Sequence, residues 1–171
     1  HRDLHSFPTR RSSDLREDKP LYKVKLSAAF CFSRTVSRME FYHNSSFLEY
    51  GGAPEKAVKS AFVSALDAWL RQNSKYQKSE SKINFNDIQD ALILVTNCFS
   101  TLTSYENQTK KAISNKFIQE AMTDFLRSRL EVYLIEHPSD AEKIGEQVLI
   151  NKRSRETAER TRLNLKKKLS G

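Results

Sequence analysis

Two stretches in the first third of the chain alternate apolar and polar residues with a period of two, which predicts half-buried strands. They cover residues 21–32 and 38–44, with a turn expected at 33–37. The alternating apolar positions are Tyr22, Val24, Leu26 and Ala28 in the first stretch and Met39, Phe41 and His43 in the second. Because the two strands follow one another so closely, a hairpin is the simplest connection between them.

A break and a long amphipathic helix follow. Gly51 and Gly52 permit positive φ angles, while Pro54 and Glu55 suit the first turn of a helix. Apolar residues then recur at helical spacing as far as Asn73. They are Val58, Ala61, Phe62, Ala65, Leu66, Trp69 and Leu70. The glycine pair lacks the lysine and serine of a phosphate-binding P-loop, so we interpret it as a structural turn.

The middle of the chain combines a short helix with a strand that is apolar on both faces. Asn84 or Asn86 can cap the short helix. Asp87 and Asp90 lie three residues apart on one face, which is too few ligands for a metal, so we expect a solvated first turn. Residues 91–95 are apolar throughout, as in a central strand that helices cover.

The C-terminal third is predicted to be helical. Asn115 can cap a helix whose apolar stripe faces a core, and His137 and Pro138 end it. Ser139 and Glu142 have the spacing of a capping box, so a second helix is expected to begin there. The stripe of the first helix consists of Ile118, Met122, Phe125, Leu126, Leu130 and Tyr133.

The length of 171 residues, 38% of them hydrophobic, is enough for one domain with an extension. No apolar run approaches the length of a membrane span, and no signal peptide is visible. Cys31 and Cys98 both lie in strand-like stretches and are expected to be reduced core residues, although the sequence leaves a bridge between them open. These features favour a cytoplasmic protein without a membrane partner.

The formal net charge of +8 is concentrated near the C-terminus. Residues 151–168 hold eight basic and two acidic residues, a net charge of +6. The basic ones are Lys152, Arg153, Arg155, Arg160, Arg162, Lys166, Lys167 and Lys168. Such an excess on one helix favours a polyanion partner over an ordinary solvated face. Because nothing in the stretch could read bases, we expect sequence-independent, salt-sensitive contacts with phosphates.

Between the central strand and the long helix, residues 106–111 contain no apolar side chain. This stretch predicts a surface loop held between rigid elements, where binding residues tend to lie. Gln108, Thr109, Lys110 and Lys111 are part of it, and lysine is a point charge suited to phosphate. Taken alone, these residues suit an ordinary solvated turn equally well.

The surroundings of the loop resemble the transducer domain of type II DNA topoisomerases, above all the ATPase subunits of DNA gyrase and topoisomerase IV. Gln108 to Lys110, followed by Ser114 and Asn115, resembles the family's Gln-Thr-Lys loop. Gly51-Gly52 resembles its Glu-Gly-Gly turn, although Tyr50 is inserted, and residues 149–159 resemble its arginine-rich helix. The family often continues the triplet with Lys-Leu-Gly, where this chain has Lys111-Ala112-Ile113.

The resemblance implies an α+β fold like that of ribosomal protein S5 domain 2, followed by a long basic C-terminal helix. It implies that Gln108 and Lys110 bind the terminal phosphate of ATP. Lys59 corresponds to a DNA-facing residue of the family, and further DNA-facing candidates are Lys152, Arg153, Arg155, Arg160 and Arg162. Implied partners are DNA, a second copy of the subunit and a gyrase A-like cleavage subunit.

The resemblance also implies what this chain needs from elsewhere. The catalytic glutamate, the glycine-rich lid and the acidic cleavage domain of the family are not in the sequence, so ATP and Mg²⁺ would be held mainly by other domains. We therefore expect a fragment of a nucleoid-associated bacterial enzyme that is inactive alone. The alternative is a free-standing basic RNA- or ribosome-binding module of S5-like fold.

Residues 1–15 show neither helical nor strand periodicity and resemble the in-frame translation of a short-read sequencing adapter. We exclude them from the fold as an artefact. Residues 16–136 are expected to form the transducer core and residues 137–171 a helical stalk that leads to an absent cleavage domain. His43 has no nucleophile or carboxylate at a catalytic spacing, so we expect a polar edge-strand histidine; no metal site is predicted.

Overall fold

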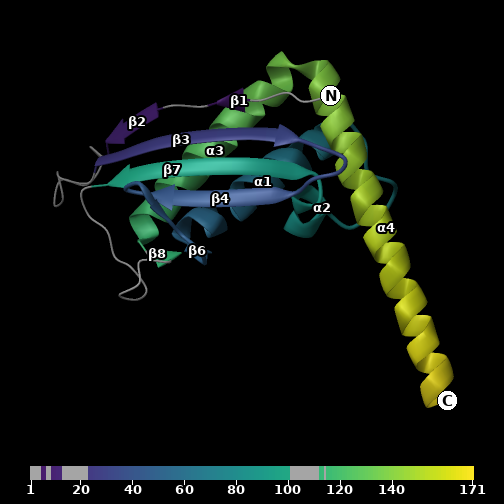
Figure 1. Ribbon diagram of the computed structural model, residues 1–171. Helices are drawn as coiled ribbons and strands as arrows, with labels where there is room; N and C mark the ends of the chain where they lie inside the picture. The colour runs from purple at the N-terminus through teal and green to yellow at the C-terminus, as the bar shows by residue number, and fades with distance from the viewer. Residues whose placement is uncertain (1–4, 7–8, 13–22, 101–111, 114) are drawn as a thin grey trace.

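A six-stranded sheet with two long helices on one face forms the body of the protein, and a third long helix projects from it (Figure 1). The computed structural model describes residues 5–6, 9–12, 23–100, 112–113 and 115–171. Within these residues the chain contains both strands and helices, which confirms that the fold mixes both element types.

The centre of the sheet is β7 (Leu92–Ser100), as its apolar sequence predicts. It pairs antiparallel with β3 (Lys23–Phe32) on one side and parallel with β4 (Arg38–His43) on the other, and β4 pairs with the short β5 (Ser46–Phe47). The predicted hairpin between β3 and β4 is therefore wrong. The reason is that β7 inserts between them, so residues far apart in the sequence form the central pairs.

The N-terminal residues also contribute to the sheet. β1 (His5–Ser6) and β2 (Thr9–Ser12) both pair antiparallel with β3, although residues 1–15 show no strand periodicity. An edge strand has a free row of backbone donors and acceptors, and almost any extended segment can satisfy them. Pairing of this kind does not depend on side-chain periodicity, which explains why the pattern missed it.

Helices α1 (Ala53–Gln72) and α3 (Lys116–Glu136) cover one face of the sheet (Figure 1). Their apolar stripes are buried as the 3.6-residue period predicts. Phe30 of β3 joins the two layers, because its ring meets Phe62 of α1 at 5.6 Å and Tyr133 of α3 at 5.8 Å, both edge to face. The core therefore lies between the sheet and these two helices.

A second, two-stranded sheet lies at the start of α1. β6 (Gly51–Gly52) pairs in parallel with β8 (Ala112–Ile113). Gly51 and Gly52 have φ angles of +65° and +82°, a region that glycine enters without strain. A side chain at Gly51 would also meet Glu55, whose Oε2 lies 2.5 Å from the position of a Cβ. The predicted turn lies one step earlier, at Glu49 and Tyr50, and the glycine pair that follows it forms a short strand.

Helix α4 (Pro138–Ser170) begins immediately after α3. Its N-cap residue is His137 and Pro138 occupies the first turn, so the predicted capping box at Ser139 is wrong. Proline suits this position because its fixed φ is helical and the first turn needs no N–H partner. His137 is therefore both the C-cap residue of α3 and the N-cap residue of α4.

The histidine and cysteine predictions have mixed outcomes. His43 is not an edge residue: it is buried between β7 and β5, and burial lowers its pKa. Cys31 and Cys98 are both free and buried, as expected. Cys98 pairs with Leu26 across the sheet, five positions from Cys31. That separation is about 17 Å along β3, too far for a disulfide.

Candidate functional site

The predicted nucleotide-contacting loop falls on residues 101–111, which lie outside the described residues, and Gln108 and Lys110 with it. The described structure defines its two ends. At the first, Asn44 holds Ser100: its Nδ2 donates to the Ser100 carbonyl at 3.2 Å and its Oδ1 accepts from the Ser100 N–H at 3.0 Å. At the second, β8 pairs with β6. The end of the loop nearer to Lys110 is therefore fixed beside the start of α1.

Lys59 lies in the second turn of α1 and is accessible. Its Nζ is 3.1 Å from Glu55 Oε1 and 6.0 Å from the centre of the Phe85 ring, and about half of its side chain is exposed. An exposed i, i+4 ion pair of this kind is weak and can be exchanged for a phosphate contact. A DNA-facing role for Lys59 stays a prediction.

Of the basic residues in the first half of α4, Lys143 is exposed, but Lys152, Arg153 and Arg155 bind carboxylates of the body. Lys152 is completely buried, and its Nζ lies 2.9 Å from Glu80 Oε2 and 2.8 Å from Glu156 Oε1. Arg153 donates two hydrogen bonds to the same Glu80 carboxylate, from Nε to Oε2 at 3.1 Å and from Nη2 to Oε1 at 3.0 Å. Glu80 belongs to the connection between α1 and α2 (Phe85–Gln89), 72 residues from Lys152 in the sequence.

A second carboxylate completes this contact. Asp87 of α2 is buried and accepts two hydrogen bonds from Arg155, at 2.8 Å from Nε and 3.2 Å from Nη2. It also forms the capping box of α2, in which Oδ2 accepts the Asn84 N–H at 2.9 Å. The expectation of a solvated Asp87 is therefore wrong, because a distant arginine covers it. We call Glu80, Asp87, Lys152, Arg153 and Arg155 the clamp.

The electrostatics of the clamp follow from these hydrogen bonds. Arg153, with further help from Lys152 and the Gln77 N–H, lowers the pKa of Glu80 to about 2. Burial opposes the charge of Lys152, but its bonds with Glu156 and Glu80 outweigh this and raise its pKa. The bond with Asp87 similarly raises the pKa of Arg155. Glu80, Lys152 and Arg155 therefore remain charged and paired near neutral pH.

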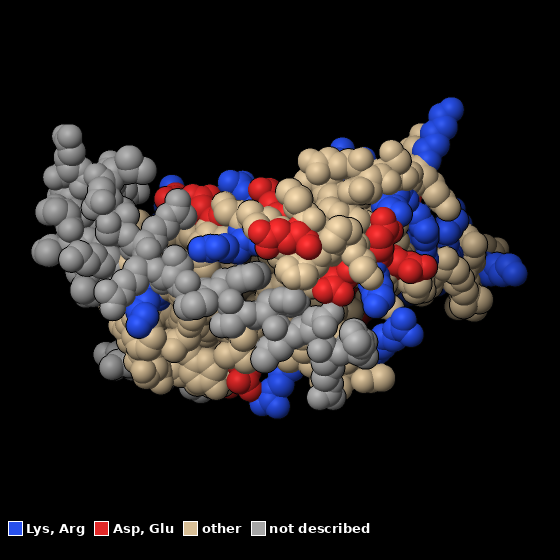
Figure 2. All heavy atoms as spheres, turned by 90° about the horizontal axis from the view of Figure 1, so that it is seen from above, with Lys and Arg blue, Asp and Glu red and all other residues tan. Residues whose placement is uncertain are grey.

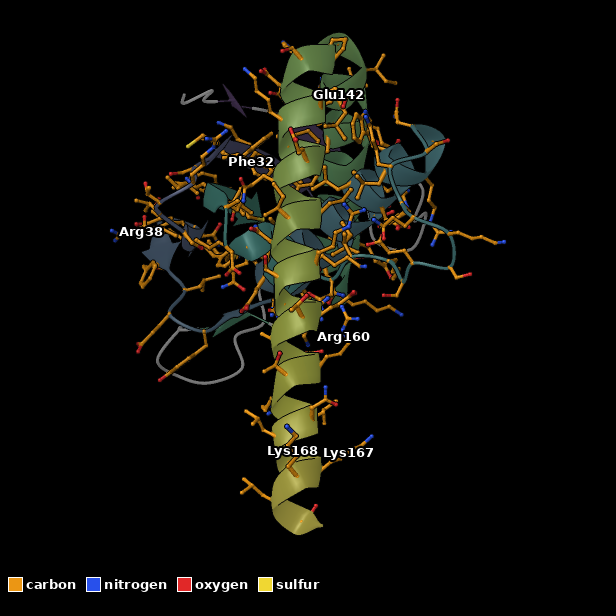
Figure 3. The ribbon with its side chains drawn as sticks, turned by 90° about the vertical axis from the view of Figure 1, so that its right-hand side faces the viewer. Phe32, Arg38, Glu142, Arg160, Lys167 and Lys168 are labelled. Carbon is orange, nitrogen blue, oxygen red and sulfur yellow. The ribbon has the colours of Figure 1, made fainter. Side chains whose placement is uncertain are left out.

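The remainder of α4 is different. Every residue from 157 to 171 is exposed, and the segment 157–170 holds five basic residues against one acidic residue, a net charge of +4. Figure 3 shows this part of the helix extending past the body, with Lys167 and Lys168 near its end. On the face seen in Figure 2, by contrast, acidic and basic side chains are interspersed over the described surface.

The DNA-facing candidates thus separate into two sets. No part of Lys152 is exposed, so the structure does not support a phosphate contact for it, and the hydrogen bonds of Arg153 and Arg155 are directed at carboxylates. Arg160 and Arg162 are exposed and can meet a phosphate. Sequence analysis missed Glu80 and the role of Asp87, because no local pattern marks a carboxylate whose partners lie 68 to 73 residues away.

A groove of about 650 Å³ lies beside the clamp, between residues 77–80 and α4. Its charged lining combines both signs, since it includes Lys78, Arg153 and Arg160 together with Glu80, Glu156 and Glu159. Three carboxylates in so small a space disfavour a bound phosphate. We therefore do not assign the nucleotide to this groove.

The described part of the chain holds neither a metal-binding cluster nor a membrane-spanning helix. There, no three His, Cys, Asp or Glu side chains are grouped so that they could hold a metal ion. No helix among these residues has the length and apolar character needed to cross a membrane.

Comparison with known proteins identifies similar sequences over most of the chain. The family model described as DNA gyrase B matches residues 3–164. The DNA gyrase B protein of Metamycoplasma arthritidis is 28% identical over 146 residues, covering 85% of this chain and 23% of its own length. The gyrase B protein of Mycoplasma genitalium is 26% identical over 146 residues, covering 82% and 22%. The chain thus spans less than a quarter of the length of these relatives.

Solved structures share the fold. The 43K ATPase domain of Thermus thermophilus gyrase B, in complex with an aminocoumarin, matches with a TM-score of 0.76 at 20% identity, over 92% of this chain and 40% of that one. The ATP-binding domain of Francisella tularensis topoisomerase IV, in complex with a small-molecule inhibitor, matches with a TM-score of 0.70 at 23% identity, over 86% and 39%. Of the two hypotheses drawn from the sequence, the match to the DNA gyrase B family model supports the topoisomerase.

Proposed function

Since the chain belongs to the DNA gyrase B family, we propose that it is the part of an ATP-dependent type II DNA topoisomerase that couples ATP binding and hydrolysis to DNA strand passage. One observation carries the proposal. The anchored end of the loop at β8 and the exposed, basic end of α4 lie on opposite sides of one body (Figure 1). A domain built in this way can meet a nucleotide at one side and DNA at the other.

At the nucleotide side, Gln108 and Lys110 contact the terminal phosphate of ATP. Pairing of β8 with β6 supports this, because it fixes the chain two residues after Lys110 to the body of the protein. ATP and its Mg²⁺ are bound mainly by parts of the parent enzyme outside this chain. Loss of the terminal phosphate on hydrolysis removes the charge partner of Lys110, which favours a second position of the domain.

At the DNA side, the contact is with the phosphate backbone and does not depend on base sequence. The net charge of +4 on residues 157–170 and their complete exposure support this assignment. Arg160, Arg162 and, on α1, Lys59 are the side chains we assign to it. Contacts of this type release counterions, so they weaken as the salt concentration rises.

The likeness to gyrase B and topoisomerase IV structures supports an S5 domain 2-like transducer core with a long basic C-terminal helix. The parent enzyme contains two copies of this subunit and a gyrase A-like cleavage subunit. It acts on DNA in the bacterial cytoplasm and is associated with the nucleoid. This chain alone hydrolyses no ATP and cleaves no DNA, because the domains that do so lie elsewhere in the parent.

The test is a Lys110→Ala substitution in the full-length subunit, assembled with its partner. We expect ATP-dependent strand passage to fall, since the alanine has no charge to bind the terminal phosphate. Lys78→Ala is the control, because Lys78 is an exposed loop lysine on another side of the fold. A Lys110→Ala enzyme that passes DNA strands at the wild-type rate would refute the assignment.

A further inference from the structure

Helix α4 is attached to the body in two ways: by a buried apolar face at Ala141, Ile144, Gly145, Val148 and Leu149, and by the clamp that follows it. At the first, Gly145 lies against Trp69 of α1 so closely that a Cβ at Gly145 would be 2.5 Å from the ring atom Cζ3. Lys75 and Glu142 form an ion pair of 2.7 Å near this apolar contact. The second attachment is the clamp, which begins seven residues after Gly145, about 10 Å along the helix axis.

The carboxylates of the clamp are almost fully used. Glu80 receives four hydrogen bonds: one from Lys152, two from Arg153 and one at 2.8 Å from the Gln77 N–H. A carboxylate has about four acceptor positions, so none is left for solvent. Asp87 receives three from side chain and backbone, and its own carbonyl accepts the Asn151 Nδ2 at 2.9 Å. The clamp therefore fixes orientation as well as distance, since the arginine forks are planar.

Beyond the clamp, residues 157–170 extend for about 21 Å. A rigid rod that is held at one point can pivot, whereas a rod held at two points keeps one direction. The apolar face that contains Gly145 is the first attachment, and it consists of packing without directed bonds. The clamp is the second attachment.

We propose that Glu80 and Asp87 are positioning residues, which fix the direction of residues 157–170 relative to the body, so that movement of the body is passed on to the exposed end of α4. The biological purpose of this transmission rests on the proposed function. The direction of the helix does not depend on that function, and it can be measured on this chain alone.

The measurement is the distance distribution between spin labels at Lys56→Cys on α1 and Asn164→Cys on α4, two exposed positions. Cys31 and Cys98 are buried and therefore do not take the label. We compare the unchanged chain, which carries only the two labels, with the variant Glu80→Gln/Asp87→Asn. We call it the charge-free variant, because both carboxylates of the clamp become neutral amides. Asparagine keeps an oxygen for the Asn84 N–H, so the cap of α2 can persist while the arginine loses a charged partner. Glu142→Gln, which breaks only the exposed pair with Lys75, is the control.

The unchanged chain and the control should give one narrow distribution, and the charge-free variant a broad one. Because that variant leaves the buried Lys152 with Glu156 as its remaining carboxylate partner, part of the change in the distribution can come from unfolding. Adding Lys152→Met removes the buried charge and should restore thermal stability. If the triple variant is stable and still broad, the clamp sets the direction of the helix. If it is stable and as narrow as the unchanged chain, the proposal is wrong.

In the full-length enzyme, the triple variant should retain ATP turnover but complete fewer strand passages per ATP, by about 5-fold or more, as expected for loss of coupling between two sites. An unchanged ratio would overturn the transmission step, even if the distance distribution broadens. If the wild-type parent shows no ATP-dependent strand passage at all, the proposed function fails, whereas the distance measurement still decides the role of the clamp.

Discussion

Both halves of α4 carry basic residues, but the first half balances four of them with four acidic residues, whereas the second half holds five against one. In the proximal half, residues 138–156, Lys152 is buried and Arg153 and Arg155 bind carboxylates from α2 and the connection before it. In the distal half, residues 157–170, Arg160 and Arg162 are exposed. The comparison teaches that a run of basic residues on one helix need not serve one purpose. Lys152, Arg153 and Arg155 hold α4 against carboxylates of the body, whereas the exposed Arg160 and Arg162 are available to an outside anion.

The surroundings also determine how each half responds to salt. Ions screen exposed charges over about 8–10 Å at physiological concentration, but they reach buried pairs poorly. Glu80 and Asp87 are only 8% and 1% exposed, so the clamp should hold under conditions that weaken contacts of the distal half. Four predictions test this division.

Asp87→Ala should have the largest effect. It removes the capping box of α2 and both hydrogen bonds of Arg155, so we expect a loss of about 3 kcal/mol in the free energy of unfolding, measured by chemical denaturation. The matched control is Asp90→Ala, three residues away and exposed, with a change within about 0.5 kcal/mol. Equal effects of the two substitutions would show that Asp87 is an ordinary surface residue.

Gly145→Leu should have the next largest effect, because the side chain would enter the space that the Trp69 ring occupies. Overpacking of this kind typically costs about 1–3 kcal/mol. Ala158→Leu, at an exposed position of the distal half, controls for the size of the new side chain and should change stability little. If both leucines are tolerated equally well in denaturation experiments, close contact at Gly145 is not needed to attach α4.

The sequence predicted α1, α3 and β7 well, because their apolar periods reflect burial against the neighbouring layer. The same reasoning could not distinguish Asp87 from Asp90. Both are acidic, both lie in or next to one short helix, and only a fold that brings Arg155 to α2 separates them. The order β3-β7-β4 was missed for a related reason, since strand pairing between distant segments has no local signal.

The candidate site was predictable only in part. Resemblance to a family assigns Gln108, Lys110 and Lys59, but no period or spacing in the chain shows a phosphate partner for them. Simple charge counting treated residues 151–168 as one basic surface. The net charge did not reveal that Glu80 and Asp87, more than 60 residues earlier, neutralise the first part of that surface.

The dependence of stability on pH should be smaller but diagnostic. The pKa of Glu80 is about 2 in the fold, below its ordinary value of 4.5, chiefly because of Arg153. Its stabilisation is therefore complete above about pH 4.5 and is lost as the pH falls towards about 2. Glu80→Gln should be less stable at neutral pH and should lose less of its remaining stability on acidification. Parallel acid-unfolding curves for the two proteins would show that Glu80 does not titrate with folding.

Substitution of the exposed arginines of α4 should change stability least and DNA binding most. Arg160→Gln and Arg162→Gln each alter one exposed side chain, so the free energy of unfolding should move by no more than about 0.5 kcal/mol. Each should nevertheless reduce by about 1 the slope of log affinity against log salt for a short DNA duplex, measured by fluorescence anisotropy. Arg153→Gln is the matched control: it should destabilise the fold and leave the slope unchanged, because its guanidinium binds Glu80. If Arg153→Gln reduces the slope as much as Arg160→Gln does, the proximal half also contacts DNA, and the division between the two halves of α4 is wrong.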